Sequence, residues 1–281
     1  MKKKKDILEL KEKAIEIRRD VLTMLSKAAS GHTGGSLSIV EILVALYFAE
    51  MNISPENRKE RNRDKFVLSK GHGCPSLYAV LAEKGFFQKE ELWTLRQIGS
   101  RLQGHPQFGL PGVEISSGSL GQGLSVALGM AIADKMDNVD SRVYCLMGDG
   151  ETNEGQIWEA AMTAAHYKLD NVCGIIDYNK LQIDGFCCDV MDLGEYRGKW
   201  ESFGWHVKEV DGHDFEEIRK GFDEARKTKG SPSILIAHTV KGKGVSFIEN
   251  KAKWHGIAPN KEELEKALKE LDEEEKRIKN C

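Results

Sequence analysis

The sequence is poor in proline and has no excess of charge of either sign. Of its 281 residues 6 are proline, and 41 basic residues nearly balance 44 acidic ones, for a formal charge of −3. This balance gives no basic field of the kind that nucleic-acid-binding proteins use, so no nucleic-acid partner is expected. With 40% apolar residues the chain can bury a substantial core, which excludes a disordered tail or a disulfide-stapled miniprotein.

Targeting and membrane signals are also missing from the pattern. The start, MKKKKDILEL, has a basic run but lacks the apolar core of a secretory signal. The most apolar helical stretch, Ser38 to Met51, contains Glu41 and Glu50 and is too short to cross a bilayer. The six cysteines form no C-x-x-C pair, which favours reduced thiols over disulfides or a zinc site. We therefore expect a soluble, cytoplasmic protein without a membrane partner.

Two familiar nucleotide-binding motifs are incomplete. Both Gly-Lys dipeptides, Gly198-Lys199 and Gly242-Lys243, lack the Ser or Thr that completes a P-loop. The glycine-rich loop at 118–123 has the order G-x-x-G-x-G rather than the dinucleotide fingerprint, and no clear strand precedes it. A nicotinamide-dependent enzyme is therefore disfavoured.

The chain instead alternates short apolar runs with helical patterns. Strands are predicted at 65–69, 142–147, 171–177, 205–210 and 234–240. Helical spacing predicts an N-terminal helix over the first thirty residues, a second helix capped by Ser36 or Ser38, and a charged helical tail at 260–279. Strands separated by helices imply parallel pairing. We predict an α/β fold, a doubly wound, mostly parallel sheet with helices on both faces, in a single domain spanning 1–281.

Polar residues follow two of the predicted strands, thirty positions apart. Asp149 and Asn179 can face one site, because ligands of open parallel sheets bind outside the carboxyl ends of the strands. A carboxylate, an amide oxygen and a backbone carbonyl form a hard oxygen set that suits Mg²⁺ shared with a phosphate. Gly148 and Gly150 leave room for a diphosphate, and the helix after 118–123 could add N–H groups. The alternative is that Asp149 only forms a turn and Asn179 only caps a neighbour.

Eight histidines divide into two groups. His32, His72, His105 and His255 lie beside glycines in loops, where imidazoles can pass protons or bind oxyanions near neutral pH. The other four lie in apolar or amphipathic segments and are interpreted as structural. The first group predicts a catalytic pocket next to the phosphate-type loops.

These motifs together resemble the thiamine diphosphate-binding N-terminal domain of transketolases. The sequence GDG at 148–150, followed by Asn179, is similar to the motif that begins with GDG and ends in asparagine. Further segments match in the same order, at 30–35, 69–73, 104–106, 118–123, 149–155 and 179–185. The resemblance extends from about residue 7 to residue 260.

The resemblance implies a role for each matching position. Mg²⁺ would be held by Asp149, Asn179 and the carbonyl of Leu181. The residues implied to lie at the thiamine diphosphate are His72, Gly118, Ser119, Leu120, Gly150, Glu154, Asn179 and Ile183. His32, His105 and His255 would be catalytic, facing the sugar and handling its hydroxyl protons. Glu154 and Glu159 would lie at a subunit interface that links two active sites, or would only complement a helix dipole.

The sequence also departs from the pattern of this family. Tyr178 precedes Asn179 where the family often has Asn or Asp, and the segment at 241–255 is altered, which makes His255 the weakest match. The chain is less than half as long as full transketolases, whose remaining part carries the glutamate that activates the aminopyrimidine ring. The resemblance therefore implies the N-terminal subunit of a split transketolase.

Such an enzyme would use thiamine diphosphate and Mg²⁺ to move a two-carbon ketol group from a ketose phosphate to an aldose phosphate, as in the pentose phosphate pathway. Its partner would be a C-terminal subunit with the pyrimidine-binding and C-terminal domains, two copies of each chain forming a heterotetramer.

Other interpretations stay open. The alpha subunit of a 2-oxo-acid dehydrogenase decarboxylase shares the cofactor motif but typically lacks the histidine loops at 30–35 and 104–106. A 1-deoxyxylulose-phosphate synthase shares several loops but normally forms one longer chain. A non-catalytic paralogue would be expected to have lost a metal ligand.

Overall fold

A five-stranded parallel sheet forms the centre of the protein. The computed structural model describes residues 2–183 and 185–280. The strand order is β1-β2-β3-β5-β4, and every neighbouring pair is parallel. The bounds are β1 (Lys65–Leu68), β2 (Val143–Gly148), β3 (Val172–Tyr178), β4 (His206–Asp211) and β5 (Ser233–His238). The five predicted strands are confirmed, each end within about two residues of its expected position.

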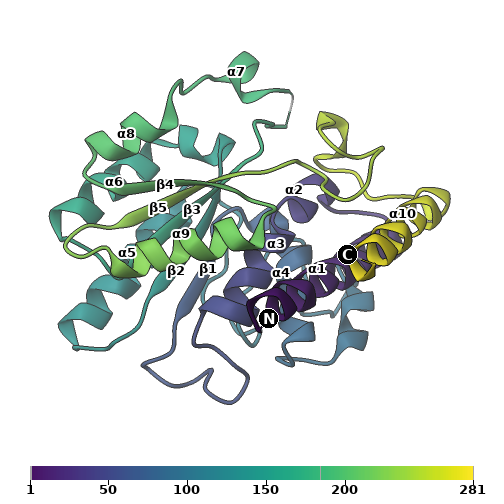
Figure 1. Cartoon of the computed structure of the whole chain (residues 1–281), viewed down its shortest axis with the longest axis horizontal. Helices are drawn as coiled ribbons and strands as arrows, with labels where there is room; N and C mark the ends of the chain where they lie inside the picture. The colour runs from purple at the N-terminus through teal and green to yellow at the C-terminus, as the bar shows by residue number, and fades with distance from the viewer. Residues whose placement is uncertain (1, 184, 281) are drawn as a thin grey trace.

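Helices cover both faces of this sheet (Figure 1). The α-helices are α1 (Lys2–Ala28), α2 (Thr33–Leu37), α3 (Val40–Ala45), α4 (Cys74–Glu83), α5 (Gln122–Met136), α6 (Gly155–His166), α7 (Cys187–Val190), α8 (Tyr196–Ser202), α9 (Phe215–Lys227) and α10 (Lys261–Lys279). Shorter helical turns are η1 (Leu46–Glu50), η2 (Gly71–Gly73), η3 (Lys89–Thr94), η4 (Gly150–Asn153) and η5 (Ala252–Trp254).

Each strand contributes side chains to two separate apolar cores. Along β2, Tyr144 and Leu146 face a core built with α1, α3, α4, α9 and α10. Val143, Cys145 and Met147 face a second core built with α5, α6 and α8. The division arises because successive side chains of a strand point to opposite faces. A strand buried on both faces has no polar side, as expected for a parallel sheet, and the predicted α/β architecture is confirmed.

The segment after the first loop differs from the sequence-based prediction. Two short helices occupy this segment, α2 with His32 and α3 with Ile39 at the N-cap, so the predicted cap at Ser36 or Ser38 is wrong. Gly34 and Gly35 lie inside α2, where an added Cβ would come 3.0 Å from Lys241 or 3.3 Å from His72, so close packing favours glycine at both positions. The 18 residues Thr33–Glu50 are apolar and long enough to cross a membrane, but 83% of this stretch is buried inside the protein. Its apolar side chains are thus part of the core.

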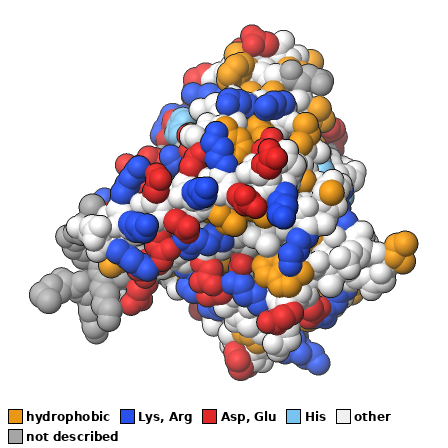
Figure 2. Space-filling model, turned by 90° about the vertical axis from the view of Figure 1, so that its right-hand side faces the viewer, with side chains coloured by type: hydrophobic (Ala, Val, Ile, Leu, Met, Phe, Trp, Pro, Cys, Tyr) orange, Lys and Arg blue, Asp and Glu red, His pale blue; other side chains and the backbone are white. Residues whose placement is uncertain are grey.

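The two longest helices, α1 and α10, pack side by side. Asn260 caps α10 with a capping box to Glu263, and Leu271 is buried against the core. Arg19 of α1 bonds to Asp272 and Glu275 of α10 at 2.7 and 2.6 Å. Figure 2 shows basic and acidic side chains interspersed on this side of the molecule, with no broad field of one sign.

Candidate active site

The loops after β2 and β3 meet at the carboxyl edge of the sheet. Asp149 follows β2 and Asn179 follows β3, and the two strands are neighbours. The Asp149 carboxylate accepts a hydrogen bond from the backbone N–H of Lys180, next to Asn179. The Asp149 N–H also donates to the carbonyl of Asp177 at 3.4 Å. The thirty-residue spacing therefore places both oxygen donors at one point.

A cavity of about 90 Å³ opens at this point. Of the residues predicted to bind cofactor, metal or sugar, it gathers His72, Leu120, Asp149, Gly150, Asn179, Leu181, Ile183 and His255. Lys70, Glu151, Gln182 and Lys241 complete most of the lining. The lining thus combines apolar side chains, among them Leu120 and Ile183, with charged ones such as Asp149 and Lys241.

The oxygen donors fit a hard divalent cation. Asp149 is 2% exposed, and its carboxylate forms no ion pair with the lysines or arginines that the structure describes. Burial, reinforced by the nearby Asp177 carboxylate, raises the pKa of Asp149 to about 6. A buried carboxylate of this kind is stabilised by a cation. The Asn179 Oδ1 accepts from the Leu181 N–H at 3.1 Å, which leaves it a second lone pair.

A different kind of metal site is not indicated. Within residues 2–183 and 185–280, no group of three His, Cys, Asp or Glu side chains is arranged to hold a metal ion. The cysteines in these ranges are all free, and Cys281 lies outside them. One carboxylate, one amide oxygen and one carbonyl suit Mg²⁺, which takes its remaining ligands from water and phosphate.

A diphosphate finds an unpartnered donor in the same cavity. The Gln182 Nε2 is buried, and no acceptor lies within bonding distance among the described residues. Lys241, which is 2% exposed, places its Nζ 3.2 Å from the Leu181 carbonyl. Burial, followed by the charge of Lys70, lowers the pKa of Lys241 to about 8. Gln182 and Lys241 could both donate hydrogen bonds to a diphosphate in this cavity.

The glycines near the cavity have packing and conformational roles that do not involve a diphosphate. A Cβ on Gly150 would lie 2.8 Å from the Gln182 side chain, so close packing already requires glycine there. Gly118 has φ +139°, and an added Cβ would meet the His105 ring at 3.0 Å. At the start of α5 the Gly121 N–H is already bonded to the Glu151 carboxylate at 2.9 Å, so this group is not free for a phosphate.

Four imidazoles form a cluster beside the cavity. The His32 ring lies 5.3 Å from His72, 6.2 Å from His105 and 5.4 Å from His255. Burial lowers the pKa of His32 to about 4 and that of His255 to about 3. These rings are therefore neutral at pH 7. His255 Nδ1 lies 3.0 Å from Lys241 Nζ, so it accepts from the ammonium and carries its proton on Nε2.

Other predicted residues lie outside the cavity. Ser119, Glu154 and Glu159 are exposed to solvent, and the Glu154 side chain lies against Gly121. The structure therefore does not bring Ser119 or Glu154 to the cavity, and their assignment as cofactor contacts stays a prediction. Gly118 lies under His105 at the rim.

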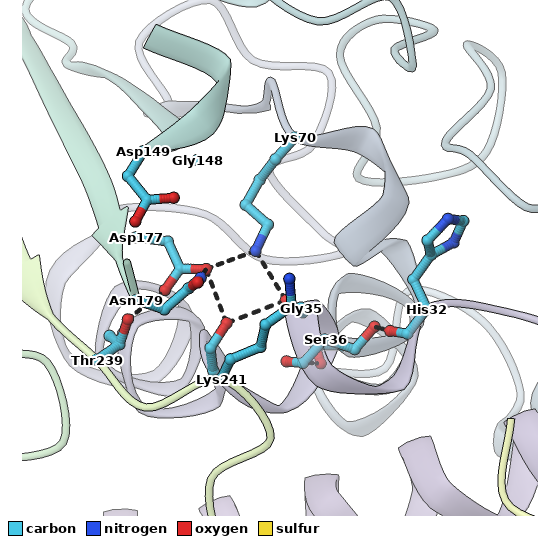
Figure 3. Close-up of polar contacts among 12 residues, drawn as sticks. His32, Gly35, Ser36, Lys70, Gly148, Asp149, Asp177, Asn179, Thr239 and Lys241 are labelled. Carbon is cyan, nitrogen blue, oxygen red and sulfur yellow. Dashed lines mark hydrogen bonds and ion pairs between the residues drawn. The ribbon is translucent and has the colours of Figure 1, made fainter. Parts of the chain in front are cut away.

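Two buried lysines were not predicted from the sequence. Lys70 is 1% exposed, and its Nζ bonds to the Asp177 carboxylate at 2.6 Å and to the Gly35 carbonyl at 2.8 Å (Figure 3). Lys241 approaches from the opposite loop. Each lysine directly follows a predicted strand, 65–69 or 234–240, and lies two or three residues after the observed β1 or β5, so the rule that placed Asp149 and Asn179 could have found them.

These features define a class of protein. A parallel sheet with hard oxygen donors, buried lysines and glycine-rich loops at its carboxyl edge is suited to bind a phosphorylated cofactor through a divalent cation. Residues 10–277 match the family model described as "Transketolase, thiamine diphosphate binding domain". The chain therefore belongs to this family.

Its similar proteins fall into two length classes. It is 48% identical to one of the subunits of apulose-4-phosphate transketolase from Phocaeicola vulgatus, over 91% of both chains. It is 45% identical to the 6-deoxy-6-sulfo-D-fructose transketolase subunit SqwG of a Clostridium species, over 95% of this chain and 98% of that one. The transketolase structure of Campylobacter jejuni superposes with a TM-score of 0.87 at 33% identity. This chain covers 48% of that longer protein.

Proposed function

We propose that this chain is the thiamine diphosphate- and Mg²⁺-binding subunit of a two-subunit transketolase. The reaction would transfer a two-carbon ketol group from a ketose phosphate to an aldose phosphate. The observation that carries the proposal is the convergence of Asp149, Asn179 and the Leu181 carbonyl beside a cluster of four imidazoles. Thiamine diphosphate, when bound, supplies the carbanion chemistry needed to break a carbon–carbon bond next to a carbonyl.

The residues of this chain would bind and orient. Asp149, Asn179 and Leu181 would hold Mg²⁺ through their oxygens, and Gln182 and Lys241 would donate to the diphosphate. Leu120 and Ile183 offer the apolar part of the lining for an aromatic ring. Ile183 is 66% exposed, so a ligand ring would cover surface that now faces solvent.

The histidines would act on the sugar as neutral donors and acceptors. His32 Nδ1 is buried and has no partner among the described residues, which leaves it available to a hydroxyl. His255 presents an Nε2–H because its Nδ1 faces Lys241. Neutral imidazoles can accept a hydroxyl proton and return it. A ketol transfer needs both steps, because the donor sugar loses a hydroxyl proton and the carbonyl oxygen of the acceptor gains one.

A second chain is supported by the relatives. Two similar proteins that this chain matches over nearly their whole length are named as transketolase subunits. The proposal therefore includes a partner chain. The heterotetramer and the cytoplasmic location are further parts of the proposal. The names of those relatives also favour a ketose with an anionic end as the donor.

The test is reconstitution with the candidate partner chain. We expect neither chain alone to transfer ketol groups, and the mixture to do so with thiamine diphosphate and Mg²⁺. Robust turnover by this chain alone would contradict the two-subunit proposal. A complex that binds the cofactor but accepts no ketose phosphate would contradict ketol transfer.

A further inference from the structure

A buried aspartate lies two residues before the proposed metal ligand Asn179. Asp177 is 0% exposed at the end of β3. Its Oδ2 accepts from Lys70 Nζ at 2.6 Å, from the Ser38 hydroxyl at 2.7 Å and from Asn179 Nδ2 at 2.8 Å. Its Oδ1 accepts from the Thr239 hydroxyl. Figure 3 shows Lys70, Asn179 and Thr239 converging on this carboxylate.

This carboxylate is already used by protein donors. A carboxylate offers about four lone-pair sites, and four donors reach Asp177, three of them on Oδ2. Most of its accepting capacity is therefore taken by protein donors.

The contact matters because an amide has two different ends. Only the oxygen of Asn179 can bind a hard cation, whereas its NH₂ group would repel one. The Asn179 Nδ2 faces the Asp177 carboxylate, and its Oδ1 faces the Leu181 N–H at 3.1 Å. In the flipped amide, oxygen would face carboxylate and NH₂ would face N–H, so both contacts would become repulsive.

We propose that Asp177, bonded to Lys70, is a positioning residue that directs the Asn179 amide oxygen toward the divalent cation. The inference rests on the proposed function, because the cation belongs to that proposal. Asp177 acts through Asn179 and does not contact the metal.

The experiment measures Mn²⁺ binding by electron paramagnetic resonance on the full chain with thiamine diphosphate present. We expect Asp177→Asn to raise the Mn²⁺ dissociation constant at least about tenfold, as is typical for lost partners of metal ligands. Ser38→Ala and Thr239→Val are matched controls, because each removes one donor to the same carboxylate and leaves Asn179 unchanged. Both controls should lower thermal stability but keep the dissociation constant of the parent chain.

A second variant covers the case in which Asp177→Asn fails to fold. That substitution leaves the Lys70 ammonium buried without a counter-charge. Combining Lys70→Met with Asp177→Asn removes one charge of each sign, so the net charge around the site is preserved. We expect the same weakening, at least about tenfold, in this double variant.

The possible outcomes separate the two proposals. If Asp177→Asn or the double variant binds Mn²⁺ as tightly as the parent while Asn179→Ala does not, the positioning role is wrong and the metal site stands. If the Ser38→Ala and Thr239→Val controls weaken binding as much as Asp177→Asn, the effect is general loss of structure and the positioning role is also wrong. If the parent chain binds no Mn²⁺ beside thiamine diphosphate, the proposed metal site and this inference both fail.

Discussion

The carboxylate of Glu151 accepts a hydrogen bond from the backbone N–H of Gly121 at 2.9 Å, which joins the turn after β2 to the start of α5. The same carboxylate accepts from the Gly148 N–H at 3.0 Å and from the Ser69 hydroxyl. Glu151 is 3% exposed. One buried acid thus holds three segments at the carboxyl edge of the sheet.

Replacing this acid should destabilise the chain. Glu151→Ala leaves the buried N–H groups of Gly121 and Gly148 without an acceptor, and we expect a loss of about 3 kcal/mol in the free energy of unfolding. Denaturant titration measures the change. Glu159→Ala, at an exposed position on α6, is the control and should change it by less than about 0.5 kcal/mol. Equal stabilities of the two variants would contradict this role.

Two glycines of α5 should respond oppositely to alanine. A Cβ on Gly123 would lie 2.4 Å from the Ser69 hydroxyl and 2.8 Å from its Cα, so Gly123→Ala should cost at least about 2 kcal/mol. Gly129 has no neighbour within 4 Å of such a Cβ, so Gly129→Ala should stabilise the helix by about 0.5–1 kcal/mol. Thermal unfolding of both variants gives the comparison. A destabilised Gly129→Ala chain would contradict the open space around this position of α5.

Chain stability should fall as the pH drops below 6.5. Burial, followed by the charge of Arg96, lowers the pKa of His32 from 6.5 to about 4. The unfolded chain therefore binds this proton more readily, and the stability present above pH 6.5 is lost as the pH falls toward 4. We expect His32 to account for about 1 kcal/mol of this loss by pH 5, after allowance for solvent screening. Denaturant titrations at pH 7 and pH 5 should show a smaller loss for His32→Gln, and identical losses would contradict the assignment.

The sheet and the position of the site could be predicted from the sequence. Strands buried on both faces appear as continuous apolar runs, and the residues that follow them lie at one edge of a parallel sheet. This reasoning placed Asp149 beside Asn179 without any contact information. It missed that Gly34 and Gly35 lie inside a helix. Adjacent glycines usually indicate a loop, but these two allow close packing against Lys241 and His72.

Long-range partners could not be predicted. Lys70 and Asp177 are 107 positions apart, and no local pattern indicates that they form a buried ion pair. Glu151 lies in the predicted metal loop, but its bond to Gly121 depends on how α5 docks against β1 and β2. The same limit explains why Ser119 and Glu154, predicted as cofactor contacts, do not line the cavity. Proximity in sequence to a site does not fix where a side chain points.

The most direct test is calorimetric titration of the full chain with thiamine diphosphate, with Mg²⁺ and with a chelator. The proposed site predicts binding that depends on Mg²⁺ in the parent chain and in Asp223→Ala, an exposed control on α9. Asp149→Ala should abolish the Mg²⁺-dependent heat, because it removes the one charged oxygen donor of the proposed set. Binding by Asp149→Ala with the affinity and Mg²⁺ dependence of the parent chain would contradict the proposed site.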